Sequence, residues 1–163
     1  MALCLLLVAR LWWSGPAAST PVRPPAGGLH RVVRVVDGDT IVIAPDNVVR
    51  LIGVDTPETV KPNHPVERFG PEATEFTKQF IGGGTVRLTF DRERVDRFGR
   101  FLAYVWVGHR LLNEHLLLVG LARFEPQFYY AERMKHRFRR AQEGARRARI
   151  GIWSPEPDRA SSR

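Results

Sequence analysis

The sequence predicts an α+β domain, mainly β, built as a small closed barrel of five short strands with three helices inserted and appended. Five segments rich in β-branched and aromatic residues are separated by turn signals, as expected for barrel strands. Three other segments carry apolar residues at helical spacing. The chain of 163 residues is long enough for one domain with a modest core. Element counts alone leave the topology of such a barrel open.

The first three strands are predicted close together, at 30–36, 40–43 and 48–54. Asp37-Gly38 supplies the turn between the first two, and Pro45-Asp46-Asn47 the turn between the second and third. Strands paired in this way would bring Asp39, Arg50 and Asp55 together, although they are far apart in the sequence.

The rest of the domain alternates helices with two more strands. Helices are predicted at 67–80, 111–118 and 131–148, and strands at 85–90 and 101–107. A Gly82-Gly83-Gly84 run ends the first helix. The last helix carries a thin apolar stripe at three- and four-residue spacing, formed by Met134, Phe138, Ala141 and Ala145. Residues 151–153 are expected to fold back on the body.

The ends of the chain differ in composition from the middle. Residues 1–28 are interpreted as a leader followed by a Pro/Gly-rich linker, 29–154 as the folded domain, and 155–163 as a loose tail. The apolar run near the start is too short to span a bilayer. It has no preceding Lys or Arg, so an over-extended start or a disordered tail remain alternatives to a secretory leader. A true leader predicts a secreted or envelope protein, and otherwise a cytoplasmic one.

Three carboxylates and one arginine lie in or beside the second and third strands. They are Asp39, Asp55, Glu58 and Arg50. Carboxylates packed closely repel each other, and a divalent cation such as Ca²⁺, which prefers oxygen ligands, removes the conflict. Arg50 would weaken a simple calcium site, but it makes sense if an anion such as a phosphodiester binds there too.

Several motifs resemble those of the staphylococcal nuclease (thermonuclease) family, in the same order and with roughly the same spacing. They are Asp37-Gly38-Asp39-Thr40, Arg50, Asp55-Thr56-Pro57-Glu58-Thr59, Phe69-Gly70-Pro71-Glu72-Ala73 and Phe98-Gly99-Arg100. The resemblance implies a five-stranded OB-fold β-barrel with three α-helices. It also implies a Ca²⁺-dependent endonuclease that hydrolyses DNA and RNA with low sequence specificity and leaves 3′-phosphate ends.

The resemblance also assigns roles to residues. Asp39, Asp55 and the backbone carbonyl of Thr56 are expected to bind one Ca²⁺ ion. Glu58 is expected to act as the general base or to position the water, and Arg50 and Arg100 are expected to contact the scissile phosphate.

Other residues of the expected site have a weaker basis. Asp37 is interpreted either as a carboxylate lying behind the metal ligands or as a turn residue. Arg97 and Phe98 occupy positions where the family has a lysine and a tyrosine that hold a terminal phosphate, so Phe98 lacks the hydroxyl group. The stacking of a base is expected to involve Phe128, Tyr129 or Tyr130, and packing of the helix connection is an equally good explanation for all three.

Each site residue also has a plain structural explanation. Asp39 could be a hairpin residue, Arg50 and Asp55 a surface salt bridge, and Glu58 an acid in the first turn of a helix. All of these explanations would have to be true at once to account for the whole set by coincidence. The catalytic interpretation is therefore preferred.

Composition agrees with a polyanionic partner without requiring one. The net charge is +8 and the isoelectric point is near 10.7, which also serves solubility. The only cysteine, Cys4, excludes an intrachain disulfide and a cysteine-based zinc site. The expected protein is a monomer without a membrane span. There are two competing functions. The carboxylates argue against a non-catalytic nucleic-acid-binding barrel, and Arg50 and Arg100 argue against a structural calcium-binding domain.

Overall fold

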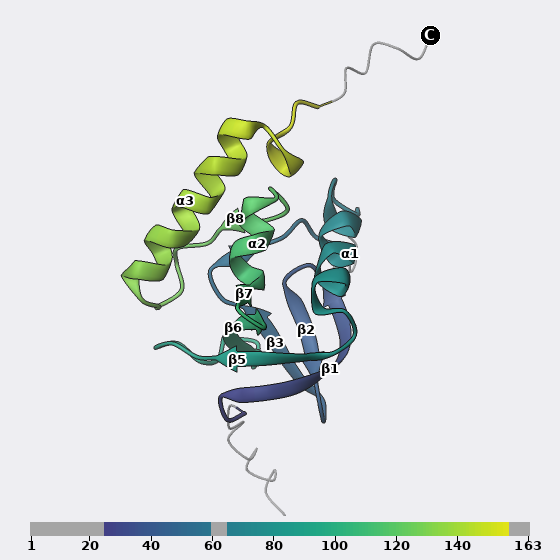
Figure 1. Cartoon of the computed structure of the whole chain (residues 1–163), viewed down its shortest axis with the longest axis vertical. Helices are drawn as coiled ribbons and strands as arrows, with labels where there is room; N and C mark the ends of the chain where they lie inside the picture. The colour runs from purple at the N-terminus through teal and green to yellow at the C-terminus, as the bar shows by residue number, and fades with distance from the viewer. Residues whose placement is uncertain (1–24, 60–64, 157–163) are drawn as a thin grey trace, which may run out of the picture.

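The computed structural model describes residues 25–59 and 65–156. The expected leader, the first half of the linker (residues 21–24), residues 60–64 and most of the 155–163 tail lie outside these residues. Figure 1 shows a barrel at one end of the molecule and three helices packed around its other end. Among the described residues, no helix is long and apolar enough to cross a membrane.

Five strands form the barrel. They are β1 (Gly28–Asp37), β2 (Thr40–Ile43), β3 (Asn47–Leu51), β5 (Thr85–Thr89) and β6 (Phe101–Val107). Their order is β3-β2-β1-β5-β6, and a parallel pairing of β3 with β6 closes the sheet. The long strand β1 pairs with β5 through residues 28–31 and with β2 through residues 32–37, where its register shifts twice. Such irregularities bend a strand, which lets β1 take part in both halves of the barrel.

Three helices accompany the barrel, as predicted. They are α1 (Gly70–Ile81), α2 (Leu112–Leu118) and α3 (Glu132–Ala148). The shorter elements are β4 (Val54–Asp55), β7 (Arg110–Leu111), β8 (Arg123–Phe124) and the 3₁₀ helix η1 (Gly151–Trp153). The predicted fold class, a closed five-stranded barrel with three helices, is therefore confirmed. η1 does fold back, since the Ile152 amide donates to the Gly120 carbonyl at 2.8 Å.

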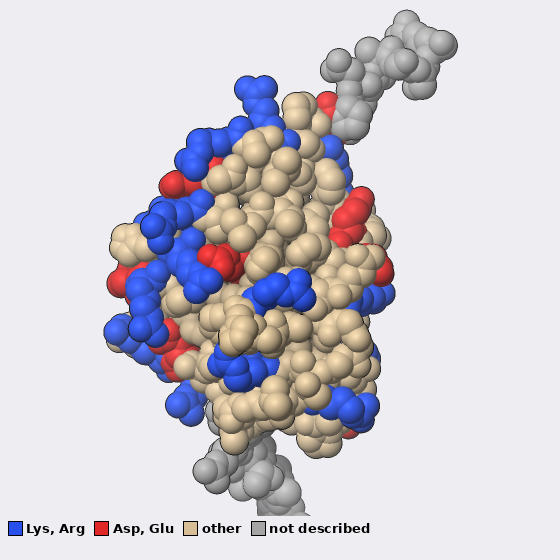
Figure 2. All heavy atoms as spheres, viewed as in Figure 1, with Lys and Arg blue, Asp and Glu red and all other residues tan. Residues whose placement is uncertain are grey.

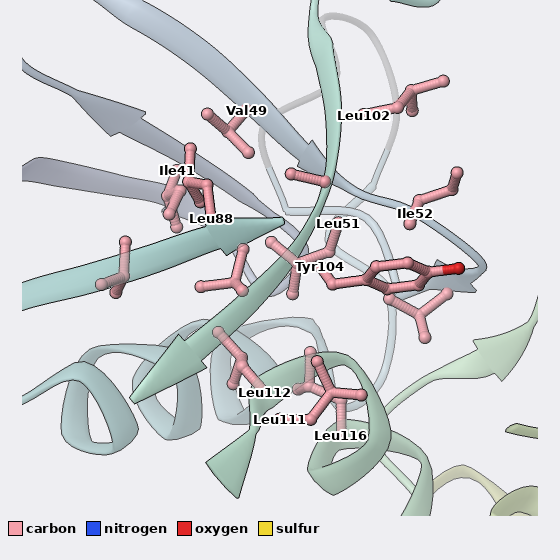
Figure 3. Close-up of a cluster of buried hydrophobic side chains, with 14 of the residues drawn as sticks. Ile41, Val49, Leu51, Ile52, Leu88, Leu102, Tyr104, Leu111, Leu112 and Leu116 are labelled. Atoms are coloured by element: carbon pink, nitrogen blue, oxygen red, sulfur yellow. The ribbon is translucent and has the colours of Figure 1, made fainter. Parts of the chain in front are cut away.

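The core fills the barrel and the space between it and the helices. Figure 3 shows Leu112 and Leu116 of α2 beside Leu51, Leu88 and Tyr104 of the strands. The predicted apolar stripe of α3 is buried at all four positions, so its remaining faces are left for polar residues.

The third strand ends earlier than predicted. It stops at Leu51, and a turn at Gly53 separates it from β4. Gly53 has a φ of 79°, and a Cβ there would lie 2.7 Å from the Tyr130 hydroxyl. Only glycine meets both requirements. The turn redirects the chain so that Asp55 lies at the barrel rim and not inside a continuous strand.

Candidate active site

One pocket collects the expected catalytic and metal-binding side chains. Its volume is about 480 Å³, and its lining residues are Asp37, Asp39, Arg50, Asp55, Thr56, Pro57, Glu58, Arg97, Phe98 and Arg100. They come from the end of β1 and the turn after it, from β3, from β4 and the segment after it, and from the turn before β6. The structure thus brings together residues that are separated by as many as 63 positions in the sequence, from Asp37 to Arg100.

Arg50 is the centre of this pocket. It projects from β3, and only 6% of its surface is exposed. Its Nη1 lies 2.6 Å from Asp39 Oδ2 and donates to the Val54 carbonyl at 2.6 Å. Its Nη2 donates to Asp55 Oδ1 at 2.9 Å and to Glu125 Oε2 at 3.3 Å. The alternative of a surface salt bridge is therefore wrong for Arg50, because the guanidinium is buried among three acids.

Asp39 is held in one orientation by its neighbours. It does occupy the β1–β2 turn, but its side chain is buried. Its Oδ2 accepts from the Thr56 amide at 2.7 Å and from the Thr56 hydroxyl at 3.1 Å, and its Oδ1 accepts from the Thr40 hydroxyl at 3.0 Å. A plain hairpin residue would not need these contacts, which join the turn to the segment that carries Asp55.

Helix α1 supports the same turn from behind. The Thr77 hydroxyl of α1 donates to the Gly38 carbonyl at 2.6 Å. A Cβ on Gly38 would lie 2.7 Å from both the Ala73 Cβ and the Thr56 Cγ2. The turn therefore packs directly on α1, and a larger residue at position 38 would displace Asp39.

The pocket carries more negative charge than Arg50 balances. Burial, and then the neighbouring Asp39 carboxylate, raise the pKa of Asp37 to about 7. Burial also raises the pKa of Asp55 and of Glu125, although the Arg50 guanidinium acts in the opposite direction on both. Asp37 also lines the pocket, and its Oδ1 accepts from the Asp39 amide at 3.2 Å.

The donor set fits a hard divalent cation in its chemistry. Its side-chain donors are carboxylate oxygens, the ligands that such cations prefer. Burial, which raises the pKa of Asp37 and Asp55, disfavours their charged forms, and a cation would relieve this cost. The set is sparse, since the expected ligands include only two carboxylates, Asp39 and Asp55. Within residues 25–59 and 65–156, no three His, Cys, Asp or Glu side chains form a ready-made metal-binding group.

Glu58 lines the pocket from the segment that follows β4. Its amide donates to Glu67 Oε2 at 3.2 Å, and its carbonyl accepts from the Glu67 amide at 2.9 Å. The helix after this segment begins only at Gly70, and its first-turn acid is Glu72. The alternative that Glu58 is an acid of the first helical turn is therefore wrong.

Arg100 is positioned by Asp96, a residue that sequence reasoning did not single out. Asp96 Oδ2 accepts from Arg100 Nε at 2.7 Å, and its Oδ1 accepts from the amides of Phe98 and Arg100, both at 2.9 Å. Asp96 therefore shapes the turn and orients the guanidinium through the hydrogen bond to Nε. The Arg100 guanidinium also lies 5.4 Å from the centre of the Phe98 ring.

A second pocket of about 400 Å³ adjoins the first and contains most of the expected nucleotide-contacting residues. Its lining includes Arg97, Phe98 and Phe128, together with Gln127. Phe98 is 67% exposed and has the Arg97 guanidinium over its ring at 4.7 Å. An exposed aromatic ring with an arginine beside it is suitable for stacking with a base.

The two tyrosines after Phe128 lie in different environments. Tyr129 is 62% exposed, with Arg92 over its ring at 5.0 Å, but it does not line either pocket. Tyr130 is only 1% exposed, and its hydroxyl donates to the Glu125 carbonyl at 3.0 Å. The structure thus corrects the expectation for Tyr130, which packs with Phe138 in the core, where no base can reach it.

Glu125 is the second residue that sequence reasoning did not single out. It reaches Arg50 because β8 pairs with β4, with Phe124 opposite Val54. These strands have two residues each, which is too short for a recognisable pattern.

Comparisons with known proteins agree with this geometry. A family model described as "Staphylococcal nuclease homologue" matches residues 48–155. The "Thermonuclease" of Staphylococcus hyicus is 42% identical over 159 residues, which cover 94% of this chain and 92% of that protein. The "Thermonuclease" of Staphylococcus intermedius is 44% identical over 160 residues, with the same coverage. The "Endonuclease YncB" of Bacillus subtilis is 39% identical over 129 residues, which cover 74% of this chain and 59% of that protein. The chain therefore belongs to the staphylococcal nuclease family.

Proposed function

We propose that this protein is a Ca²⁺-dependent endonuclease that hydrolyses phosphodiester bonds of DNA and RNA with low sequence specificity. The observation that carries the proposal is the buried Arg50 held between Asp39 and Asp55 at the bottom of an open pocket. A guanidinium placed among acids in this way can receive an anion if further positive charge is supplied. Family membership and the printed names of the relatives support the same chemistry.

The residues of the pocket divide the reaction among them. Glu58, which lines the pocket, would hold a water and accept its proton as the oxygen attacks phosphorus. Arg50 and Arg100 would hold the non-bridging oxygens, and these contacts strengthen as charge builds on them. Arg100 would also stabilise the leaving 5′ oxygen, so that the products carry 3′-phosphate ends.

Asp39, Asp55 and the Thr56 carbonyl would hold the calcium ion. When bound, this ion would polarise the phosphate and orient the water. Asp37 would support the arrangement through the Asp39 amide. The neighbouring pocket, with Arg97, Phe98 and Phe128, would hold the adjoining nucleotide by charge and stacking, without reading base edges.

The test is digestion of supercoiled plasmid and of a structured RNA, each with Ca²⁺, with Mg²⁺ and with a chelator. We expect both polymers to be cleaved with Ca²⁺, and the fragments to prime DNA synthesis only after phosphatase treatment. Binding of both polymers without cleavage under all conditions would favour the non-catalytic barrel instead. Cleavage that persists in chelator would contradict the role given to calcium.

A further inference from the structure

Helix α3 displays a basic surface that the candidate active site does not use. From Arg133 to Arg149 the sequence contains eight Lys or Arg residues and one Glu. Figure 2 shows blue side chains along the edge of the molecule that α3 forms in Figure 1, interrupted by a few red ones. Because the apolar stripe of α3 faces the core, the charged residues of the helix lie on its outer faces.

Three of these arginines form a regular row, which we call the α3 arginine row. It consists of Arg133, Arg140 and Arg147, all exposed. They are seven residues apart, so successive side chains rise about 10.5 Å along the helix and rotate by only about 20°. The row therefore presents three cations along one face over about 21 Å.

Nothing in the described part of the chain neutralises the row. Helix α3 has two acids, and one of them, Glu132, pairs with Lys135 at 3.2 Å. The other, Glu143, forms no ion pair among the described residues, although it lies three positions from Arg140 and four from Arg147. Within those residues, the row also has no acidic partner on another element.

The stability of the helix does not explain the row. Cations near the end of a helix favour its dipole, which is a sufficient reason for Arg147. Arg133 lies in the first turn of α3, where a cation is unfavourable. A bound polyanion would offset this unfavourable interaction between Arg133 and the helix dipole.

Helix α3 is attached to the strand pair that borders the pocket. The Phe124 amide of β8 donates to Gln142 Oε1 of α3 at 2.8 Å. The Arg139 guanidinium lies 5.5 Å from the centre of the Phe124 ring. Phe124 lies opposite Val54, the residue before Asp55. Helix α3 therefore lies next to the strand pair that carries Asp55.

We infer that the α3 arginine row is a second binding surface for polynucleotide, which contacts backbone phosphates outside the pocket. The inference deepens the proposed function and rests on it for the identity of the polyanion. An anionic membrane is a poorer partner, because the apolar residues of α3 are buried in the body and leave no face to insert. The surface would raise the affinity for long substrates and leave short ones unaffected.

The test compares two triple variants that remove the same charge. One is Arg133→Gln/Arg140→Gln/Arg147→Gln, and the control is Arg31→Gln/Arg34→Gln/Lys78→Gln. The control residues are exposed and lie on β1 and α1, which do not pack on α3. Binding of a fluorescent DNA duplex is measured by anisotropy over a range of salt concentrations, with chelator present to prevent cleavage.

The expected result is a change in salt dependence. Each lost phosphate contact lowers the slope of log K against log salt by about 0.9 for duplex DNA, so the α3 variant should lose about 2.7. The control should lose less than about 1. Equal slopes for the two variants would overturn the inference. An α3 variant that keeps the wild-type DNA slope but no longer binds phosphatidylserine vesicles would also overturn the inference, because the row would then be a membrane-binding surface.

Activity assays separate this inference from the proposed function. With Ca²⁺, the α3 variant should cleave a dinucleotide at the wild-type rate but show a raised KM for long DNA. A wild-type protein that cleaves neither substrate would contradict the proposed function, while the salt slope would still test the row. If circular dichroism shows that the triple variant has lost helix, Arg140→Gln alone decides, with an expected loss of about 0.9 in slope.

Discussion

Replacing Asp37 with Asn should make the metal-free protein more stable above neutral pH. Asn keeps an oxygen that can accept from the Asp39 amide, as Asp37 Oδ1 does at 3.2 Å. Burial and the Asp39 carboxylate raise the pKa of Asp37 from 3.8 to about 7, a difference of about 3.2. At about 1.36 kcal/mol per pKa unit, ionised Asp37 costs the folded protein at most about 4 kcal/mol. Since Asp37 is only partly buried, we expect a gain of about 2–4 kcal/mol for the variant.

The raised pKa of Asp37 also determines how the stability difference between the two proteins changes with pH. A carboxyl group whose pKa is raised by folding binds more protons in the folded state, so wild-type stability should fall as pH rises from about 4 to about 7. The advantage of Asp37→Asn should be near zero at pH 4 and complete above pH 8. Burial also raises the pKa of Asp55 and Glu125, but these two groups are present in both proteins and their contributions largely cancel.

The assay is urea unfolding in chelator, followed by tryptophan fluorescence at several pH values between 4 and 8.5. Asp46→Asn is the matched control, because Asp46 is an exposed residue in the turn between β2 and β3. It should follow the wild type at every pH. The reasoning would be refuted if Asp37→Asn also followed the wild type, or if it were the less stable protein at pH 8.

The remaining predictions concern turnover. Glu58→Gln should lower kcat by about 10²- to 10⁴-fold with little change in polynucleotide binding, whereas Glu72→Gln, in the first turn of α1, should change neither. Comparable losses of binding and kcat would contradict a role for Glu58 in the chemistry. Arg100→Ala should lower kcat by roughly 10²- to 10³-fold. Asp96→Asn keeps an acceptor for the turn amides but removes the negative charge that pairs with Arg100. The activity lost should therefore be smaller than in Arg100→Ala, and mainly in kcat. A larger effect of Asp96→Asn would show that Asp96 does more than position Arg100.

Local patterns were enough to predict most of the barrel. The observed bounds of β2 and β6 are the predicted ones, because both are apolar, β-branched or aromatic runs between clear turn signals. Helix α1 begins three residues later than predicted, after Phe69 adopts a left-handed conformation with φ of 70°. The apolar stripe of α3 was predictable because its spacing depends only on helix geometry.

The missing parts of the site depend on contacts between distant segments. Glu125 lies 75 residues from Arg50, and it is brought there by two strands of two residues each. The sequence could not distinguish Tyr130 from Tyr129, because two adjacent tyrosines in a connection carry no pattern that shows which one is buried. In the structure Tyr130 is buried and Tyr129 is exposed. Its burial depends on Gly53, whose missing side chain leaves space for the Tyr130 hydroxyl.

The arrangement around Arg50 would link the binding of a cation to the binding of a phosphate. Arg50 faces three acids, Asp39, Asp55 and Glu125, so a phosphate entering the pocket meets net negative charge. A cation held by Asp39 and Asp55 would reverse that balance, while Glu125 and the Val54 carbonyl would still hold the guanidinium in place. By linkage, a phosphate that binds better after the cation must also strengthen binding of the cation. The buried arginine would weaken a site built only for calcium, but in a pocket for both ligands it would make the affinity for each depend on the other.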